Sequence, residues 1–486
     1  MNTPTIKRFL SIVMIFVFVA IQGWATCGGG GGGGMGGMGG GGMSDAQTYP
    51  VPWKLANSLE PTMKDGLDVY WFPTGDQEFK NSSLRQSRIL SLYSQQCVAM
   101  SVADYTGPLG KKYVPDAKVP VAVMVQGDGT VVGKVEDKKG RLSVGDLEKL
   151  VDTEVKKRDT AVKVKLDDAK AKAKAGDTKT AIAELHQVVD QKCMFPNRAK
   201  DAAKELKKLG ESSLNIEKMP DGPNFSPVVT ARIKKTMSAG VMAEDDAKYR
   251  TAERLYTAAH NMDPNDPTPL RYLGELYRHE TGEWDKARDT FNQILAMPAD
   301  PISRAVALHG LGKMTIHEGD FKKGLSLMES SVSEYPLPLA YRNLAVYWNS
   351  EGNREKADEY TRKALALDPQ EPFNVIFAAT FLAGNGHGDE ALKIAKEHES
   401  ILCASYNLAA IYAQLGQKDK ALTLLRRHFF VYERYQSVRS KEMMEARVDA
   451  VFISLAKDPT FIALTSGADG RLAIPASMGG NKPSGN

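Results

Sequence analysis

Cysteine and histidine side chains are the groups in this sequence that could carry redox, nucleophilic or metal chemistry. The 486 residues include only four cysteines, Cys27, Cys97, Cys193 and Cys403, and eight scattered histidines. No two cysteines have zinc-ligand spacing, and none is followed by a nearby histidine in a zinc pattern. The spacing therefore predicts no metal centre. It leaves open whether a disulfide forms, for which Cys97 with Cys193 is one option in an exported chain.

The sequence also lacks the motifs of the common catalytic classes. His279-Glu280 and His317-Glu318 are not followed by the second histidine that a metalloprotease helix needs. It contains neither a phosphate-binding P-loop nor the Gly-x-Ser-x-Gly elbow of serine hydrolases. We therefore expect a protein that is not an enzyme and that needs no cofactor.

Composition excludes several broad classes of protein. Hydrophobic residues make up 42% of the chain, and 63 basic residues stand against 59 acidic ones, for a formal net charge of +4. These values are typical of a globular protein, and the length predicts about three domains. Without a marked basic excess, we expect no nucleic-acid partner.

The N-terminus has the pattern of an export signal. Two basic residues precede an uncharged run over residues 9–21, and the small residues Gly23 and Ala25 stand at the −3 and −1 positions. We expect a signal peptide over residues 1–25 and a mature protein in the periplasm or cell envelope. Two alternatives stay open, a lipoprotein signal that leads to acylation of Cys27 and an uncleaved N-terminal anchor.

A glycine-rich segment over residues 26–50 follows this signal. Of the 43 glycines in the chain, 13 stand within residues 28–42. Such a stretch has nothing to bury and great backbone freedom, so we expect a flexible tether.

Residues 51–152 change to an α/β pattern. The expected elements are a strand over 67–72, a helix over 82–95, a strand over 97–103, a hairpin over 119–135 and a closing helix over 142–155. Asp104, Tyr113, the Val119-Pro120 step and the turn at 127–129 follow in the order found in thioredoxins. The region therefore resembles the thioredoxin fold, and this resemblance implies that Pro120 is the cis-proline of the family.

One departure from that family decides the expected chemistry. A redox-active member has Cys-x-x-Cys directly after the first core strand, where the helix N-terminus lowers a thiol pKa. Here residues 72–77 read Phe-Pro-Thr-Gly-Asp-Gln, without cysteine. The domain is therefore expected to be redox-inactive and to serve as a binding or structural module. We expect Cys97, at the start of an apolar strand, to be a small buried hydrophobic residue.

Helical repeats of about 34 residues occupy most of the remaining chain. Recurring marks include Leu273-Gly274, Leu344-Ala345 and Leu408-Ala409, and Asp-Pro steps end two of the second helices. This pattern resembles the tetratricopeptide repeat (TPR), and the expected fold is mixed, with the α/β domain followed by an all-α TPR superhelix. The expected divisions are a TPR-like helical hairpin at 153–210, a linker at 211–230, TPR repeats at 231–430, capping helices at 431–466 and a flexible tail at 467–486.

The TPR resemblance implies a concave groove lined by the first helix of each pair. The family's groove positions map onto Arg271, Glu275, Arg278, His279, His309, Lys313, His317, Arg342, Asn349 and Tyr406. This set is mildly basic and partly aromatic, which suits an acidic or carboxylate-bearing peptide.

The sequence thus predicts an exported, non-enzymatic scaffold that binds a protein or peptide partner through its TPR groove. Two alternatives remain, an envelope thiol-redox or chaperone-like protein that uses Cys97 or Cys193, and a self-assembling structural protein of the envelope. Membrane contact is expected only through an N-terminal lipid anchor or an uncleaved signal. The partner and the oligomeric state are not predicted.

Overall fold

The computed structural model covers the α/β region and the helical repeats. It describes residues 48–56, 66–116, 118–136, 140–211, 216, 219, 221–369, 371–433 and 436–466. The signal peptide, Cys27, nearly all of the glycine-rich tether and the tail from residue 467 lie outside the described residues. Among the described residues, no helix is both long and apolar enough to cross a membrane.

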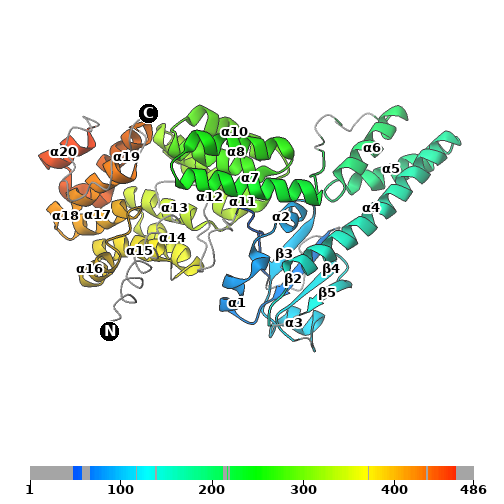
Figure 1. Cartoon of the computed structure of the whole chain (residues 1–486), viewed down its shortest axis with the longest axis horizontal. Helices are drawn as coiled ribbons and strands as arrows, with labels where there is room; N and C mark the ends of the chain where they lie inside the picture. Colours follow the sequence, from blue (N-terminus) through cyan, green and yellow to red (C-terminus); the bar gives the residue numbers. More distant parts are fainter. Residues whose placement is uncertain are drawn as a thin grey trace, which may run out of the picture.

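A five-stranded mixed sheet forms the core of the N-terminal domain (Figure 1). Its strands are β1 (Lys54–Leu55), β2 (Leu67–Phe72), β3 (Val98–Val102), β4 (Val121–Gln126) and β5 (Val131–Glu136), and their order is β1-β3-β2-β4-β5. β3 pairs in parallel with β1 and β2, whereas β4 is antiparallel to both β2 and β5. The apolar strand β2 is buried along its whole length because it lies at the centre of the sheet. The Val119–Pro120 peptide bond, just before β4, is cis.

Short helices cover this sheet. They are α1 (Asp76–Asn81), α2 (Arg88–Ser94) and α3 (Pro108–Tyr113). The helix expected over 82–95 begins later than predicted, because Ser82 and Ser87 each cap a separate element, a short 3₁₀ turn at Ser83–Arg85 and then α2.

A single long helix, α4 (Val144–Lys174), leaves the sheet and continues into the helical hairpin with α5 (Thr178–Asp190), followed by α6 (Pro196–Lys208) (Figure 1). The sequence predicts a closing helix over 142–155 and treats the TPR-like hairpin at 153–210 as a separate unit. The two are continuous because neither glycine nor proline interrupts residues 146–175.

A disulfide joins Cys97, next to β3, to Cys193, between α5 and α6, with the two Cα atoms 5.7 Å apart. The expectation that Cys97 is a buried hydrophobic thiol is therefore wrong. Its backbone has a φ of 56° and its side chain is only half-buried, which allows the bond to the exposed Cys193.

Antiparallel helix pairs then stack into a TPR-like superhelix (Figure 1). The pairs run α7 (Pro227–Asp245) with α8 (Tyr249–Met262), α9 (Pro267–Glu275) with α10 (Trp284–Ala296), α11 (Pro301–His317) with α12 (Phe321–Glu334), α13 (Pro338–Ser350) with α14 (Arg354–Leu367), α15 (Pro372–Gly384) with α16 (Gly388–Glu397), and α17 (Ser405–Gln414) with α18 (Lys418–Arg427). Glycines with positive φ end several first helices, among them Gly319, Gly352 and Gly416, because this conformation suits residues without a Cβ.

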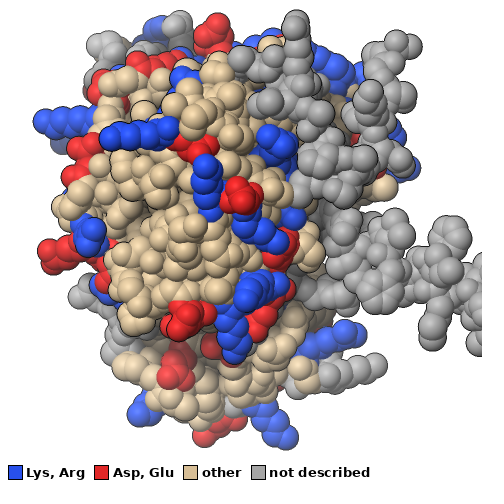
Figure 2. Space-filling model, turned by 90° about the vertical axis from the view of Figure 1, so that its left-hand side faces the viewer, with Lys and Arg blue, Asp and Glu red and all other residues tan. Residues whose placement is uncertain are grey.

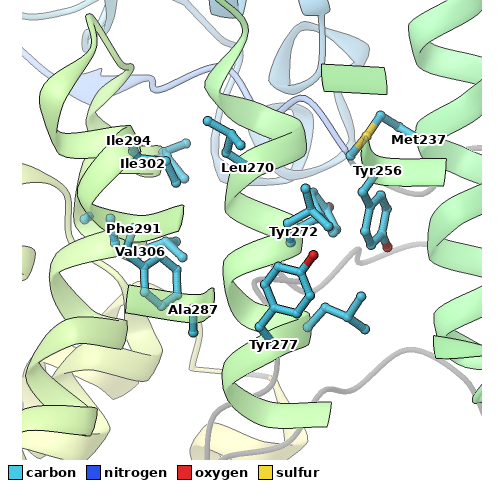
Figure 3. Close-up of a cluster of buried hydrophobic side chains, with 14 of the residues drawn as sticks. Met237, Tyr256, Leu270, Tyr272, Tyr277, Ala287, Phe291, Ile294, Ile302 and Val306 are labelled. Carbon is cyan, nitrogen blue, oxygen red and sulfur yellow. The ribbon is translucent and has the colours of Figure 1, made fainter. Parts of the chain in front are cut away.

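Small residues let the helices approach closely around Phe291, which Figure 3 shows among its buried hydrophobic neighbours. The ring of Phe291, in α10, lies between Gly274 and Gly310, and a Cβ at either glycine would come within 2.3 Å of a ring carbon. Ala287, Ile294 and other buried side chains complete this core.

The last described helices differ from a simple cap on the final repeat. They are η4 (His428–Tyr432), a π-helical turn that continues α18, then α19 (Gln436–Val448), the 3₁₀ turn η5 (Ala450–Leu455) and α20 (Pro459–Thr465). Phe452 and Phe461 pack into the core of the last repeats, as a cap would. Helix α19 instead lies against the inner face of the superhelix, as the contacts below show.

Candidate binding groove

The inner face of the superhelix, here called the groove, is formed by α9, α11, α13, α15 and α17. Helix α19 lies over α11, α13, α15 and α17, and residues of all five helices line one pocket. Seven of the ten predicted groove side chains are buried, with less than 10% of their surface exposed: Arg271, Glu275, Arg278, His279, His309, Lys313 and Arg342. His317, Asn349 and Tyr406 are half-buried. Other residues of the same chain, among them those of α19, therefore cover most of the predicted groove side chains.

An acidic side chain of α19 faces two of the predicted basic groove residues. The Glu445 carboxylate lies 3.4 Å from His317 Nε2 and 3.9 Å from Lys313 Nζ. Burial alone would raise the pKa of Glu445, but the charges of Lys313 and His317 outweigh burial and hold this pKa at about 2. Glu445 is therefore ionised and contributes an electrostatic attraction between α19 and α11.

A second acidic contact lies just beyond α19. The Tyr406 hydroxyl donates a hydrogen bond to Asp449 Oδ2 over 3.1 Å, and Asp449 also accepts from the backbone N–H of Val451. Burial, with the nearby charge of Glu445, raises the pKa of Asp449 to about 6. Tyr406 also contacts the ring of Phe452 edge-on at 5.2 Å. This predicted groove residue thus holds the end of α19 in place.

The middle of the groove holds buried cationic and imidazole groups. His309 Nε2 accepts from Asn343 Nδ2 over 2.7 Å, which requires a neutral imidazole. Burial and the charges of Arg278, Lys313 and Arg342 lower the pKa of His309 well below its ordinary value, so it stays neutral.

Arg342 Nη1 donates a hydrogen bond to Asn374 Oδ1. The Arg342 guanidinium lies 4.7 Å from the centre of the Phe373 ring. Burial lowers the pKa of Arg342 to about 10. Asn349 lines the same pocket as Arg342, together with Glu445 and Asp449.

The predicted residues of the α9 repeat have other partners. Arg271 Nη2 donates to the backbone oxygen of Thr48 over 3.0 Å, so the segment before the sheet covers it. Arg278 pairs with Glu275 over 2.6 Å within the same helical turn. His279 does not join this pair; its two ring nitrogens lie beside Glu280 and Glu433. The structure thus places Lys313, His317 and Tyr406 against the carboxylates of Glu445 and Asp449. Arg271 and the Glu275–Arg278 pair have the other partners named above.

Sequence reasoning missed a second polar centre, where the sheet domain meets the repeats. Arg88, at the first position of α2, is fully buried and pairs with Asp263 and Asp266, between α8 and α9. It also donates to Thr230 Oγ1 over 2.9 Å, and the Tyr49 hydroxyl donates to Asp266 over 2.8 Å. The sequence pattern gives Asp263 only the role of ending a helix with the proline that follows it. Nothing in its local sequence indicates a partner 175 residues away.

The face of the molecule drawn in Figure 2, which is the left-hand end of Figure 1, shows no large area of one charge. Basic and acidic side chains are interspersed there around uncharged residues. The expectation that nucleic acid is not a partner stays a prediction.

Comparisons with known proteins match the helical part. Residues 270–297 match a family model described as tetratricopeptide repeat. A CTR9 homolog of Arabidopsis thaliana is 24% identical over 234 residues, which cover 37% of this chain and 21% of that protein. The photosystem I assembly protein Ycf3 of Rippkaea orientalis (strain PCC 8801 / RF-1) is 28% identical over 133 residues, which cover 24% of this chain and 75% of that protein.

Two solved structures show weaker likenesses. Pseudomonas aeruginosa PilF is 13% identical with a TM-score of 0.31, over 45% of this chain and 99% of that one. The APC/C hetero-tetramer Cut9-Hcn1 is 14% identical with a TM-score of 0.32, over 60% of this chain and 59% of that one. From the repeat match and the stacked helix pairs together, the chain has a TPR-type helical repeat fold, which generally mediates protein–protein interaction.

Proposed function

We propose that this chain is an exported, non-enzymatic scaffold whose groove binds an acidic segment of a partner polypeptide. The observation that carries this proposal is the pair of carboxylates, Glu445 and Asp449, that the chain's own C-terminal segment already places in the groove. Glu445 and Asp449 are held there by Lys313, His317 and Tyr406. The same basic and hydroxyl groups would receive carboxylates of a partner that competes with α19.

Other observations support the remaining parts of the proposal. The signal-like pattern over residues 1–25 supports export, and the Cys97–Cys193 disulfide agrees with an oxidising compartment. We infer that the sheet domain is a redox-inactive thioredoxin-like module. Its strand order, its cis bond before Pro120 and the lack of cysteine in residues 72–77 support this inference. An assembly role, as in the name of the Ycf3 relative, would suit a groove that exchanges one acidic segment for another.

Exchanging the charges of Lys313 and Glu445 tests whether the groove binds carboxylate-bearing segments. The probe is a labelled peptide of residues 436–449, which reproduces α19, and fluorescence anisotropy measures its binding to the full chain. Glu445→Lys places a positive charge beside Lys313 and His317, so α19 is displaced and the peptide binds at least about tenfold more tightly than to wild type. Lys313→Glu combined with Glu445→Lys restores opposite charges, and peptide binding returns close to the wild-type level.

Lys322→Glu is the control, because Lys322 is an exposed lysine of α12 on the outer face. It should leave peptide binding unchanged. If folded Glu445→Lys protein binds the peptide no better than wild type, the groove does not recognise acidic segments in this way.

A crosslinking experiment tests the scaffold role in cells. A photoreactive amino acid at position 349, in the groove pocket, should trap a partner protein, whereas the same group at position 322 should not. Equal recovery of the same proteins from both positions would contradict a groove-bound partner.

A further inference from the structure

Two histidines and two glutamates meet in a buried cluster where the C-terminal segment crosses the repeats. His279 lies in η3 (Leu276–Glu280), His428 opens η4, Glu433 follows η4 and Glu442 lies in α19. All four are at least nine-tenths buried. The N and O atoms that His279, Glu433 and Glu442 offer all lie within 4.8 Å of one another.

The hydrogen bonds around His279 leave one nitrogen pointed at the carboxylates. His279 Nδ1 lies 2.8 Å from Glu280 Oε1, and a carboxylate can only accept, so Nδ1 carries the proton of this bond. Nε2 lies 3.6 Å from Glu433 Oε1, too far for a hydrogen bond, and neither atom has a hydrogen-bond partner among the described residues. A carboxylate that fixes one imidazole nitrogen while the other faces anionic ligands is the usual arrangement behind a metal-bound histidine.

Glu442 is oriented in a similar way. Its Oε2 lies 2.6 Å from His428 Nε2, so His428 holds this carboxylate toward the cluster.

The backbone is also unusual at this point. Both η3 and η4 are π-helical turns, and both contribute to the cluster. Such turns are rare and occur frequently at functional sites, since the extra residue redirects side chains.

We propose that His279, Glu433 and Glu442 bind one divalent transition-metal cation of the Zn²⁺ class. Zn²⁺ bound by imidazole nitrogen and carboxylate oxygen at about 2.0–2.2 Å places its ligand atoms about 3.4 Å apart in a tetrahedron. The 3.6 Å between His279 Nε2 and Glu433 Oε1 fits that spacing. Glu280 and His428 act as positioning residues. The cation links η3 to the segment before α19 and to α19 itself, so it fastens the C-terminal helix across the repeats.

The test is metal binding by the full chain, independent of any peptide or partner. Protein freed of metal by chelation and dialysis is titrated with Zn²⁺ by calorimetry, and its thermal midpoint is measured with and without the metal. Wild type should bind one Zn²⁺ per chain at this site and gain thermal stability. Glu433→Gln and His279→Gln should each weaken that binding at least tenfold and remove the thermal gain. A tenfold excess of Mg²⁺ should not displace Zn²⁺, because Mg²⁺ prefers a shell of oxygen ligands.

The combined variant Glu397→Gln/His398→Gln removes an adjacent glutamate and histidine outside the cluster and serves as the matched control. It should bind Zn²⁺ as wild type does. Glu433→Gln keeps the side-chain shape and removes a buried charge, so circular dichroism should show a folded chain. X-ray absorption of the wild-type complex should show one imidazole among oxygen ligands. Absence of stoichiometric binding, binding unaffected by both cluster variants, or a sulfur-containing ligand shell would each overturn the proposal.

Discussion

Arg88 of the sheet domain donates from Nε to Asp266 Oδ2 of the repeats over 3.2 Å, and both side chains are completely buried. A second carboxylate, Asp263, binds the same guanidinium through Nη2. The fully buried Arg88 therefore compensates two carboxylates at once, at the place where the two domains join. This arrangement explains why the sheet domain has a defined position against α7 and α8.

Replacing Arg88 by methionine should destabilise the chain by about 3–5 kcal/mol, because two buried carboxylates lose their cation. Thermal and urea unfolding measure the loss. Arg362→Met is the control, since Arg362 forms an exposed pair with Asp358, and it should change stability by less than about 0.5 kcal/mol. Adding Asp263→Asn and Asp266→Asn to Arg88→Met should recover part of the loss. Wild-type stability for Arg88→Met would contradict the role of this ion pair.

The Cys97–Cys193 disulfide closes a loop with a sequence separation of 96 residues. Cys97→Ser combined with Cys193→Ser should cost about 4 kcal/mol, because the unfolded chain regains the freedom that the loop had removed. Relative to the oxidised wild type, each single variant should lose about as much as the double variant, since the bond needs both sulfurs. A double variant within about 1 kcal/mol of wild type would contradict the stabilising role of the bond, and titration of free thiols in the unfolded wild type would show directly whether the bond forms. The single variants also bear on the thiol-redox alternative, because insulin reduction that depends on either cysteine would favour it over a scaffold.

Close packing of Phe291 against two glycines gives a third prediction. Gly274→Ala and Gly310→Ala should each destabilise by about 1–3 kcal/mol, because the added methyl group overlaps the ring and overpacks the core. Chemical unfolding provides the measurement. Gly145→Ala is the matched control in α4, where the nearest atom to the new Cβ is 3.8 Å away, and it should be neutral or slightly stabilising. Equal effects at positions 145 and 274 would contradict the packing explanation.

The helix pairs could be predicted because their signals are local. Glycine, proline and small residues end helices and allow close crossings, so Gly274 and Gly319 indicate helix pairs without any knowledge of distant residues. The strands of the sheet are indicated in the same way by short apolar runs such as residues 67–72 and 121–126.

The partners across the groove could not be predicted, because they are far apart in the sequence. Lys313 lies on α11, whereas Glu445 lies on α19, after the last repeat. The periodicity of α19 shows that one face is apolar without showing which surface it covers. The sequence therefore predicts that the residues after the last repeat cap its end, as α20 does, whereas α19 lies in the groove. The set of groove positions indicates an acidic ligand, and the chain's own Glu445 and Asp449 occupy that place.

Asp449 should make stability depend on pH. Its pKa is raised to about 6 by burial and by Glu445, from an unfolded value of about 4. The folded state therefore binds the proton more strongly than the unfolded state does. The contribution of this group is most favourable below about pH 4 and falls as the pH rises through 6. Asp449→Asn removes the charge, so its stability relative to wild type should increase by about 2–3 kcal/mol between pH 4 and pH 7.

Urea unfolding of wild type and Asp449→Asn at both pH values measures this difference. The amide introduced by this substitution would be a poorer hydrogen-bond partner for Tyr406, so only the change with pH, and not the offset at one pH, reports the buried charge. Asp389→Asn replaces an exposed aspartate at the start of α16, and its difference from wild type should vary much less with pH. A difference that stays constant for Asp449→Asn, or that shrinks as the pH rises, would mean that the Asp449 carboxylate is not buried against Tyr406 as the groove contact requires.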